Sequence, residues 1–247
     1  MTVTVLPPPQ DVLRRHVLLL DVDGTLLDIA PTPESVVVPE GLPETLDVLH
    51  RALAGGLAII SGRPLDQIDL LTRNTLPAGA EHGAVLRIPP DPVRRLQLPS
   101  VPQAWRQVAA GMAARFPGAR IEDKESGFVL HYRNAPAAGP ALDRLLRGLM
   151  QGEARFEILP ADMAWEVRPR GADKGTALQA IMQGRAFVDR IPLFIGDDIT
   201  DLDAIRAAQT MGGIGLRVAE SFGSPASVRS WLSDLRRHAE TRARGGA

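Results

Sequence analysis

Val17-Leu18-Leu19-Leu20-Asp21-Val22-Asp23-Gly24-Thr25-Leu26 is the stretch that decides the fold. Four apolar residues lead into two aspartates and a glycine, which is typical of a buried parallel strand that ends where its sheet meets a ligand. In doubly wound α/β sheets, ligands bind beyond such strand ends. The stretch therefore predicts an α/β fold with a doubly wound, mostly parallel sheet and a functional site at this edge.

The two aspartates need a compensating partner. Side chains alternate along a strand, so Asp21 and Asp23 are expected to point the same way. Their charges repel unless a cation, a shared proton or solvent compensates, and a divalent metal such as Mg2+ suits hard oxygen ligands beside a phosphate. Gly24 permits a sharp turn near a ligand, and Thr25 offers a hydroxyl there. An ordinary strand followed by an Asp-Gly turn is the competing interpretation.

Composition narrows the class of protein. The chain has 247 residues, of which 45% are hydrophobic, enough for one large or two modest domains. The net charge of -1 does not indicate binding to nucleic acid or to an anionic membrane. No apolar run approaches the roughly 20 residues of a membrane span. The N-terminus does not resemble a signal peptide and cysteine is absent from the sequence. We therefore expect a cytoplasmic monomer that binds neither nucleic acid nor membrane.

Lysine is rare in this chain. Of 28 basic residues only two are lysines, Lys124 and Lys174. A lysine kept where arginine is used nearly everywhere indicates a place that needs a compact ammonium rather than a planar guanidinium. Chance retention is the alternative.

Two further apolar strands are predicted to end in polar groups. Residues 57–60 lead into Ser61-Gly62-Arg63-Pro64, and residues 191–195 lead into Gly196-Asp197-Asp198-Ile199-Thr200-Asp201. Ser61 precedes a helix N-terminus, where amides and the helix dipole favour an anion, although a capping serine explains it equally. For Asp198 and Asp201, an acidic helix N-terminus stabilised by the dipole stays open.

The middle of the chain has a different order of predicted helices and strands. After Pro89-Pro90-Asp91-Pro92, the pattern reads helix, strand, strand twice over, which predicts an inserted α+β cap at residues 91–168. Residues 1–90 and 169–247 then form the core domain. The first 14 residues are interpreted as a loose lead-in because of the proline run, and the arginine-rich end after Arg236 as a fraying tail.

The ordered set of motifs is Asp-x-Asp-Gly-Thr at 21–25, Ser61-Gly62, Lys174 and Gly-Asp-Asp-x-x-Asp at 196–201, and it resembles the haloacid dehalogenase superfamily of phosphotransferases with a Rossmann-like core. The resemblance implies that Asp21 is a nucleophile forming an aspartyl-phosphate and that Asp23 protonates the leaving oxygen and then activates water. It also implies that Ser61 and Lys174 hold phosphoryl oxygens, and that Asp21, the Asp23 carbonyl and Asp197 hold Mg2+.

Elementary electrostatics explains this choice of residues. A carboxylate about 4 Å from a phosphate dianion meets roughly 4 kcal/mol of repulsion per charge pair at an effective dielectric of about 20. A divalent cation and an ammonium offset that repulsion and stabilise the transferring phosphoryl group.

Further motifs point to one family within this superfamily. They are Gly79-Ala80-Glu81-His82-Gly83, Glu122-Asp123-Lys124-x-Ser126, Leu130-His131-Tyr132-Arg133 and residues 166–175. With the other motifs they resemble trehalose-6-phosphate phosphatases over about residues 17–218. The resemblance implies that Glu122, Lys124 and Glu166 bind the distal glucose of trehalose 6-phosphate.

Further residues and alternatives go with this resemblance. Thr25 and Arg63 are expected to touch substrate as well, while His82, His131, Arg133 and Arg168 are weaker candidates. An exposed ion pair is the competing interpretation of Glu122 and Lys124. The resemblance thus predicts a Mg2+-dependent trehalose-phosphatase. The alternatives are a phosphatase for sucrose phosphate or mannosyl-phosphoglycerate, or an inactive domain that senses sugar phosphates.

Overall fold

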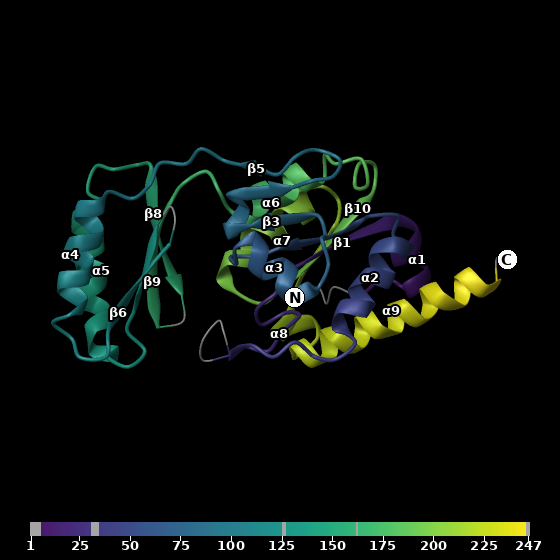
Figure 1. Cartoon of the computed structure of the whole chain (residues 1–247), viewed down its shortest axis with the longest axis horizontal. Helices are drawn as coiled ribbons and strands as arrows, with labels where there is room; N and C mark the ends of the chain where they lie inside the picture. The colour runs from purple at the N-terminus through teal and green to yellow at the C-terminus, as the bar shows by residue number, and fades with distance from the viewer. Residues whose placement is uncertain (1–5, 31–34, 125–126, 162, 246–247) are drawn as a thin grey trace. The chain divides into compact units, whose positions relative to one another are not determined.

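The apolar stretch before Asp21 forms strand β1 (His16–Leu20), which is buried along its whole length within a seven-stranded sheet. In the computed structural model shown in Figure 1, the strand order is β11-β10-β1-β2-β3-β4-β5. Neighbouring strands from β11 to β3 run parallel, and β4 and β5 add an antiparallel edge. The predicted mostly parallel sheet is confirmed.

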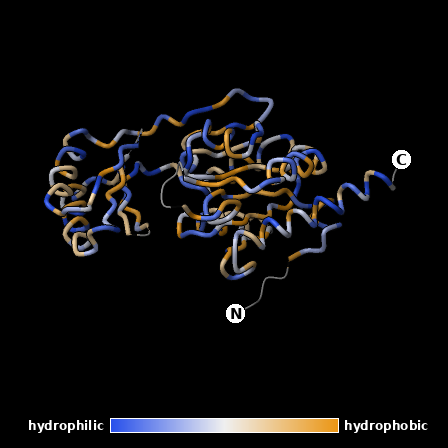
Figure 2. Tube along the Cα trace, turned by 60° about the horizontal axis from the view of Figure 1, so that its bottom comes forward, coloured by the Kyte–Doolittle hydropathy of each residue, from blue (hydrophilic) through white to orange (hydrophobic). Residues whose placement is uncertain are grey.

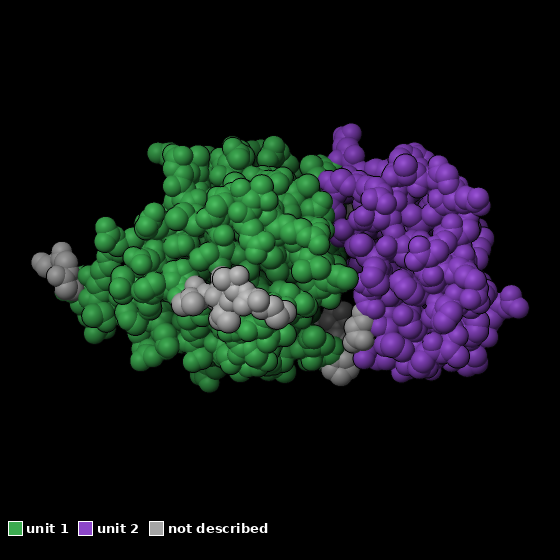
Figure 3. All heavy atoms as spheres, turned by 180° about the vertical axis from the view of Figure 1, so that it is seen from behind, with its two compact units in different colours: residues 1–96, 173–247 green, residues 97–172 purple. Residues whose placement is uncertain are grey.

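The structure describes residues 6–30, 35–124, 127–161 and 163–245. These separate into two compact units, a first unit of residues 1–96 and 173–247 and a second unit of residues 97–172, coloured in Figure 3. The boundaries expected from the sequence lie after residues 90 and 168. The role of the second unit as a cap stays a prediction.

The two faces of the first unit's sheet carry separate apolar cores. Leu18 and Leu20 belong to one core, which includes residues of α1, α2 and α9. Val17 and Leu19, which point the opposite way, belong to the other, which includes residues of α6 and α7. Figure 2 shows hydrophobic residues along the central strands. Helices cover both faces of the sheet, which is therefore doubly wound. The central strands are continuously apolar because both of their faces are buried.

The elements of the first unit have the following bounds. Its strands are β1, β2 (Leu57–Ile60), β3 (Ala78–Ala80), β4 (Val85–Arg87), β5 (Arg94–Arg95), β10 (Ile191–Gly196) and β11 (Ile214–Arg217). Its helices are α1 (Pro9–Arg15), α2 (Leu42–Ala52), α3 (Leu65–Thr72), α6 (Lys174–Ile181), α7 (Leu202–Thr210), α8 (Val218–Ser221) and α9 (Pro225–Gly245), with 3-10 turns η2 (Glu81–Gly83) and η4 (Ile199–Asp201).

The second unit is an α+β layer built from the predicted double helix-strand-strand pattern. Its sheet has the order β6-β7-β9-β8 with every neighbouring pair antiparallel. Phe128 and Leu130 of that sheet share a core with Leu142 and Leu146 of a covering helix. The elements are α4 (Gln103–Ala113), β6 (Arg120–Asp123), β7 (Phe128–His131), η3 (Pro136–Ala138), α5 (Gly139–Leu149), β8 (Phe156–Ala161) and β9 (Ala164–Pro169).

Two expectations about the ends of the chain are wrong. Helix α1 occupies Pro9–Arg15, where a loose lead-in was expected, and it buries Val12 and Leu13. A proline is tolerated in the first turn of a helix, where its missing N–H would have no intrahelical partner, so the proline run starts this helix. Helix α9 continues to Gly245 instead of fraying after Arg236, and Arg236 pairs with Glu240 one turn later at 2.8 Å.

Among the described helices, none has the combination of length and apolar character needed to cross a membrane.

Candidate active site

Three neighbouring parallel strands of the first unit end in polar side chains. Asp21 follows β1, Ser61 follows β2 and Asp197 follows β10. Strand β1 pairs with β10 on one side and β2 on the other, so the three residues lie at one edge of the sheet. The structure thus brings together the three strand ends that the sequence analysis selected.

Lys174 joins this edge from the first residue of α6. Its Nζ donates to Asp21 Oδ1 at 2.7 Å and to Asp201 Oδ1 at 2.6 Å. Lys174 and Asp21 are each 3% exposed and Asp201 is fully buried. A lysine in the first turn of a helix is disfavoured by the helix dipole, and two buried carboxylates compensate for that position here.

Asp201 is a site residue that the sequence analysis left undecided. Its Oδ2 accepts hydrogen bonds from the backbone N–H groups of Asp197 and Asp198, both at 3.0 Å, while its Oδ1 holds Lys174. A carboxylate four residues after Asp197 can fold back onto the amides that follow β10, which is the signal in the sequence. Asp198 instead caps η4 through Ile199 N at 2.6 Å, as the alternative interpretation allowed.

Asp23 has a different partner from Asp21. Arg63 Nε donates to Asp23 Oδ2 at 2.7 Å, and Arg63 Nη2 donates to Asp23 Oδ1 at 2.6 Å. Asp23 therefore has Arg63 as its cation, whereas Asp21 shares Lys174 with Asp201. Arg63, which was predicted to bind substrate, instead forms a bidentate contact with Asp23.

The turn after β1 is shaped by close packing. Gly24 has φ +72°, and a Cβ atom there would lie 1.9 Å from Asp197 Oδ2, so only a glycine lets the turn lie against Asp197. Thr25 is fully buried, and its hydroxyl donates to Asp21 Oδ2 at 3.3 Å. This contact favours a role for Thr25 in orienting Asp21.

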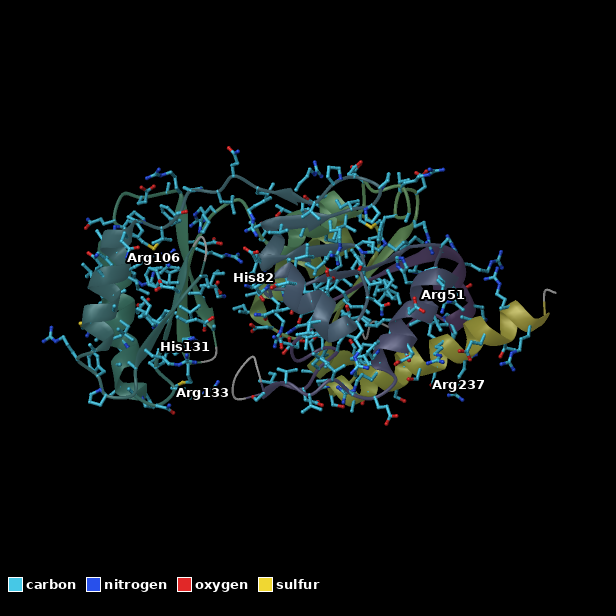
Figure 4. The ribbon with its side chains drawn as sticks, in the orientation of Figure 1. Arg51, His82, Arg106, His131, Arg133 and Arg237 are labelled. Atoms are coloured by element: carbon cyan, nitrogen blue, oxygen red, sulfur yellow. The ribbon has the colours of Figure 1, made fainter. Side chains whose placement is uncertain are left out.

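The loop Glu81–Gly83 braces the turn after β2. Glu81 N donates to Arg63 O and His82 N donates to Ser61 O, each at 3.0 Å. His82, labelled in Figure 4, has φ +56° and places its ring where a Cβ atom on Gly62 would lie, 2.5 Å from Nε2. Ser61 Oγ, which is almost fully buried, accepts from Arg63 N at 3.2 Å. The Gly79–Gly83 motif thus acts on the position of Ser61.

Burial and charge shift the ionisation of this cluster. Burial, reinforced by the charge of Asp201, raises the pKa of Asp21 well above its usual range, although Lys174 opposes the shift. Burial also works to lower the pKa of Lys174, but Asp21 and Asp201 outweigh it and the net shift is upward. Burial, together with Asp201 and Asp198, raises the pKa of Asp197 to about 6. The cluster holds more negative charge than Lys174 neutralises.

The donor set fits a divalent cation. Carboxylate oxygens of Asp21, Asp197 and Asp201 lie within 4.8 Å of one another. All are hard oxygen donors, and the raised pKa of Asp197 shows that a further positive charge would be stabilising there. Asp201 uses its oxygens on Lys174 and two backbone amides, and Asp21 uses its oxygens on Lys174 and Thr25, so a cation would take the remaining lone pairs of these carboxylates. That the backbone carbonyl of Asp23 is a further Mg2+ ligand stays a prediction.

The second unit carries its own charged face. Glu122, Val129 and Glu166 are cross-strand neighbours in one row, on the sheet face opposite the helices that pack on Phe128 and Leu130. Lys124 Nζ donates to Glu166 Oε1 at 2.9 Å, so Lys124 forms an ion pair with Glu166 on this face.

His131, labelled in Figure 4, is the partner of Glu122 on this face. Its Nε2 lies 2.7 Å from Glu122 Oε2, and the pKa of Glu122 is lowered, chiefly by this hydrogen bond. The structure therefore brings all three predicted sugar-binding residues onto one face and adds His131 to them.

Helix α4 supports that face from the other side of the sheet. Arg106 Nη1 donates to Asp123 Oδ1 at 2.7 Å and Arg106 Nη2 donates to Lys124 O at 3.1 Å. Arg106, labelled in Figure 4, therefore ties the end of β6 to the helix. Ser126, part of the motif in the sequence analysis, lies outside the described residues.

The doubly wound sheet gives the first unit a haloacid dehalogenase-like fold. A solved haloacid dehalogenase-like hydrolase from Bacteroides thetaiotaomicron superposes with a TM-score of 0.59 at 13% identity, covering 90% of this chain and all of that one. The family model described as Trehalose-phosphatase matches residues 19–232. The chain belongs to the trehalose-phosphatase family and is an enzyme of that class.

Individual relatives agree with this membership. The chain is 34% identical to the trehalose-6-phosphate phosphatase of Escherichia coli (strain K12) over 222 residues, covering 88% of this chain and 81% of the relative. It is 35% identical to a probable trehalose-phosphate phosphatase of Sinorhizobium fredii over 226 residues, covering 88% and 85%. The C-terminal domain of C. albicans trehalose-6-phosphate phosphatase has a TM-score of 0.74 at 21% identity, covering 92% and 96%, which shows a shared fold.

Proposed function

We propose that this enzyme hydrolyses trehalose 6-phosphate to trehalose and inorganic phosphate through an aspartyl-phosphate on Asp21. The observation that carries the proposal is the buried contact of the Lys174 ammonium with Asp21 and Asp201, at the edge of the sheet where Ser61 and Asp197 also lie. This arrangement holds a nucleophilic carboxylate next to a fixed positive charge, as attack on an anionic phosphate ester requires.

In the first step, an Asp21 carboxylate oxygen attacks phosphorus and the bond from phosphorus to the sugar oxygen breaks. Asp23 donates a proton to that departing oxygen, so trehalose leaves as a neutral alcohol. Lys174 and Ser61 hold phosphoryl oxygens during the transfer. In the second step, Asp23 takes a proton from water, the water oxygen attacks phosphorus, and inorganic phosphate leaves with Asp21 restored as a carboxylate.

Asp21, the backbone carbonyl of Asp23 and Asp197 would hold Mg2+ in this proposal. The cation would supply positive charge that lowers the repulsion between the Asp21 carboxylate and the phosphate ester. The acidic excess of the cluster supports this assignment, since Asp21, Asp197 and Asp201 share one lysine.

We propose that the second unit is the specificity cap and that Glu122, Lys124 and Glu166 bind the distal glucose. Carboxylates accept hydrogen bonds from sugar hydroxyls and an ammonium donates them, so a sugar without matching hydroxyls leaves charged groups poorly satisfied. The clustering of the three residues on one sheet face supports this role. A monomeric state and a cytoplasmic location stay predictions from the sequence.

The test is phosphate release by the purified protein from trehalose 6-phosphate, sucrose 6-phosphate and mannosyl-3-phosphoglycerate, with Mg2+ and with EDTA. We expect the trehalose ester to be preferred by kcat/KM and EDTA to abolish turnover, with Mg2+ restoring it. Preference for another ester would reassign the substrate. Binding of trehalose 6-phosphate without turnover of any ester would favour the sensing alternative.

A further inference from the structure

We infer that Arg63 is the positioning residue for Asp23: it aims the proton-donating carboxylate at the sugar oxygen instead of binding substrate itself. The inference rests on the proposed function, because it assumes that Asp23 is the general acid. It also replaces the substrate-binding role that the sequence predicted for Arg63.

The side chains of Arg63 and Asp23 form a bidentate contact. Arg63 Nε and Nη2 each donate to a different oxygen of Asp23, at 2.7 Å and 2.6 Å. A guanidinium is planar and rigid, so two parallel hydrogen bonds define the plane of the carboxylate as well as its position. The remaining terminal nitrogen, Nη1, donates to Gln67 Oε1 at 3.3 Å, which ties the fork to α3.

Burial distinguishes the two partners. The Arg63 side chain is 11% exposed and the Asp23 side chain is 41% exposed. The guanidinium is thus anchored within the protein, while the carboxylate that it holds presents part of its surface outward. The difference in exposure favours a role for Arg63 in positioning Asp23 over a role in binding substrate.

The backbone of Arg63 is also held by hydrogen bonds. Its N–H donates to Ser61 Oγ at 3.2 Å and its carbonyl accepts from Glu81 N at 3.0 Å. The phosphate-side serine and the general acid are therefore set by the same residue. A shift of Arg63 would move Asp23 relative to Ser61, which is the relation that matters for protonating the departing oxygen.

The arrangement leaves room for acid catalysis. Each carboxylate oxygen has two lone pairs, and the fork takes one on each oxygen, so a further position on each stays available to a proton. A general acid must reach hydrogen-bond distance of its target, and misplacing a reacting group by about 1 Å can cost about 100-fold in rate. The cost falls on substrates whose leaving group needs a proton, and a sugar alkoxide is one of them.

The experiment compares Arg63→Gln with wild type on trehalose 6-phosphate and on p-nitrophenyl phosphate, whose leaving group departs without protonation. We expect kcat for the trehalose ester to fall about 10- to 100-fold with KM within about threefold of wild type, because proton transfer is affected and binding is not. The single-turnover rate of p-nitrophenolate release, which reports only the first step, should stay within about threefold of wild type, because that leaving group needs no proton from Asp23. Arg63→Lys, which keeps the charge without the fork, should recover part of the loss.

The control is Arg51→Gln, which removes an exposed Arg–Asp pair on α2 and should change neither rate. Should Arg63→Gln fold poorly, Gln67→Leu removes the tie to α3 and should show a smaller loss with the same split between kcat and KM. A rise in KM for the trehalose ester at unchanged kcat would make Arg63 a substrate-binding residue. An equal loss in the single-turnover rate of p-nitrophenolate release, or faster turnover of the trehalose ester, would also overturn the inference.

Asp23→Asn separates this inference from the proposed function. If this variant keeps wild-type turnover of the trehalose ester, Asp23 is not the general acid and the proposed mechanism fails. If Asp23→Asn loses turnover while Arg63→Gln keeps it, the mechanism stands and the positioning role of Arg63 is wrong.

Discussion

The two lysines of this chain stand in opposite environments. The side chain of Lys174 in the first unit is 4% exposed and touches two buried carboxylates, whereas the side chain of Lys124 in the second unit is 34% exposed and touches Glu166. Of the carboxylate partners on this face, Glu122 has a side-chain exposure of 38%, whereas Glu166 is largely buried at 10%. One cluster is closed to solvent and the other is partly open.

The difference follows from what each cluster is proposed to do. A group that stabilises charge on a transferring phosphoryl must be fixed before the substrate arrives, because reorganisation during the reaction would raise the barrier. Groups that recognise a neutral sugar must exchange their mutual contacts for contacts with hydroxyls, which partly hydrated ion pairs do at little cost. The first cluster is therefore expected to control turnover and stability, and the second to control affinity.

The largest expected effect is that of Asp21→Asn on turnover. The change keeps the shape of the side chain and removes its nucleophilic charge, so kcat should fall more than about 1,000-fold. Phosphate release from trehalose 6-phosphate measures it, with Asp47→Asn on the surface of α2 as a matched control. Residual turnover within tenfold of wild type would contradict covalent catalysis by Asp21.

Lys174→Met tests the closed cluster for stability. Removing the ammonium leaves two buried carboxylates without their cation, and breaking a buried pair in this way costs about 3–5 kcal/mol of the free energy of unfolding. Urea unfolding of both proteins measures this loss, and turnover should disappear with it. A loss below about 1 kcal/mol would show that the cluster reorganises or admits water.

Lys124→Met is the matched change in the open cluster. Lys124 is partly exposed but its partner Glu166 is largely buried, so the free energy of unfolding should fall by about 1 kcal/mol, less than for Lys174→Met. A lost hydrogen bond from a charged donor to a sugar hydroxyl costs about 1.5–3 kcal/mol, so KM for trehalose 6-phosphate should rise roughly 10- to 100-fold at nearly constant kcat. An unchanged KM would remove Lys124 from the proposed sugar site.

The smallest effect concerns Asp197 and pH. Burial and the neighbouring Asp201 and Asp198 raise the pKa of Asp197 from its usual 3.8 to about 6. Between these values the folded protein holds a proton that the unfolded chain has lost, so stability falls as pH rises through this window and the penalty is complete above pH 6.

Without Mg2+, Asp197→Asn should therefore melt about 2–4 °C above wild type at pH 8, and the gap should close toward pH 4. Scanning calorimetry across pH measures it. Adding Mg2+ should raise the melting temperature of wild type more than that of the variant. A gap that does not depend on pH would attribute the difference to packing.

Local patterns were sufficient for most of the fold. Continuous apolar runs predicted β1, β2 and β10, because strands that are buried on both faces carry few polar side chains. The ends of the chain were misjudged for the opposite reason. The burial of Val12 in α1 and the length of α9 depend on packing against each other and on α2, which no window of a few residues contains.

The site was predictable only in part. Asp21, Ser61, Lys174 and Asp197 follow from strand and helix ends, since topology brings parallel strand ends to one edge. Their partners were not predictable: the fork of Arg63 on Asp23 joins residues 40 apart, and the contact of Lys174 with Asp21 joins residues 153 apart.

By itself, the amino-acid sequence determined which residues are candidates for chemistry and in what order they come, because strand ends, turns and retained lysines are local features of the chain. The tertiary structure alone decided the pairing: Lys174 lies between Asp21 and Asp201, Arg63 holds Asp23, and Lys124 meets Glu166. The physical reason is that ion pairing acts through space over a few ångströms, and distance along the chain carries no record of it.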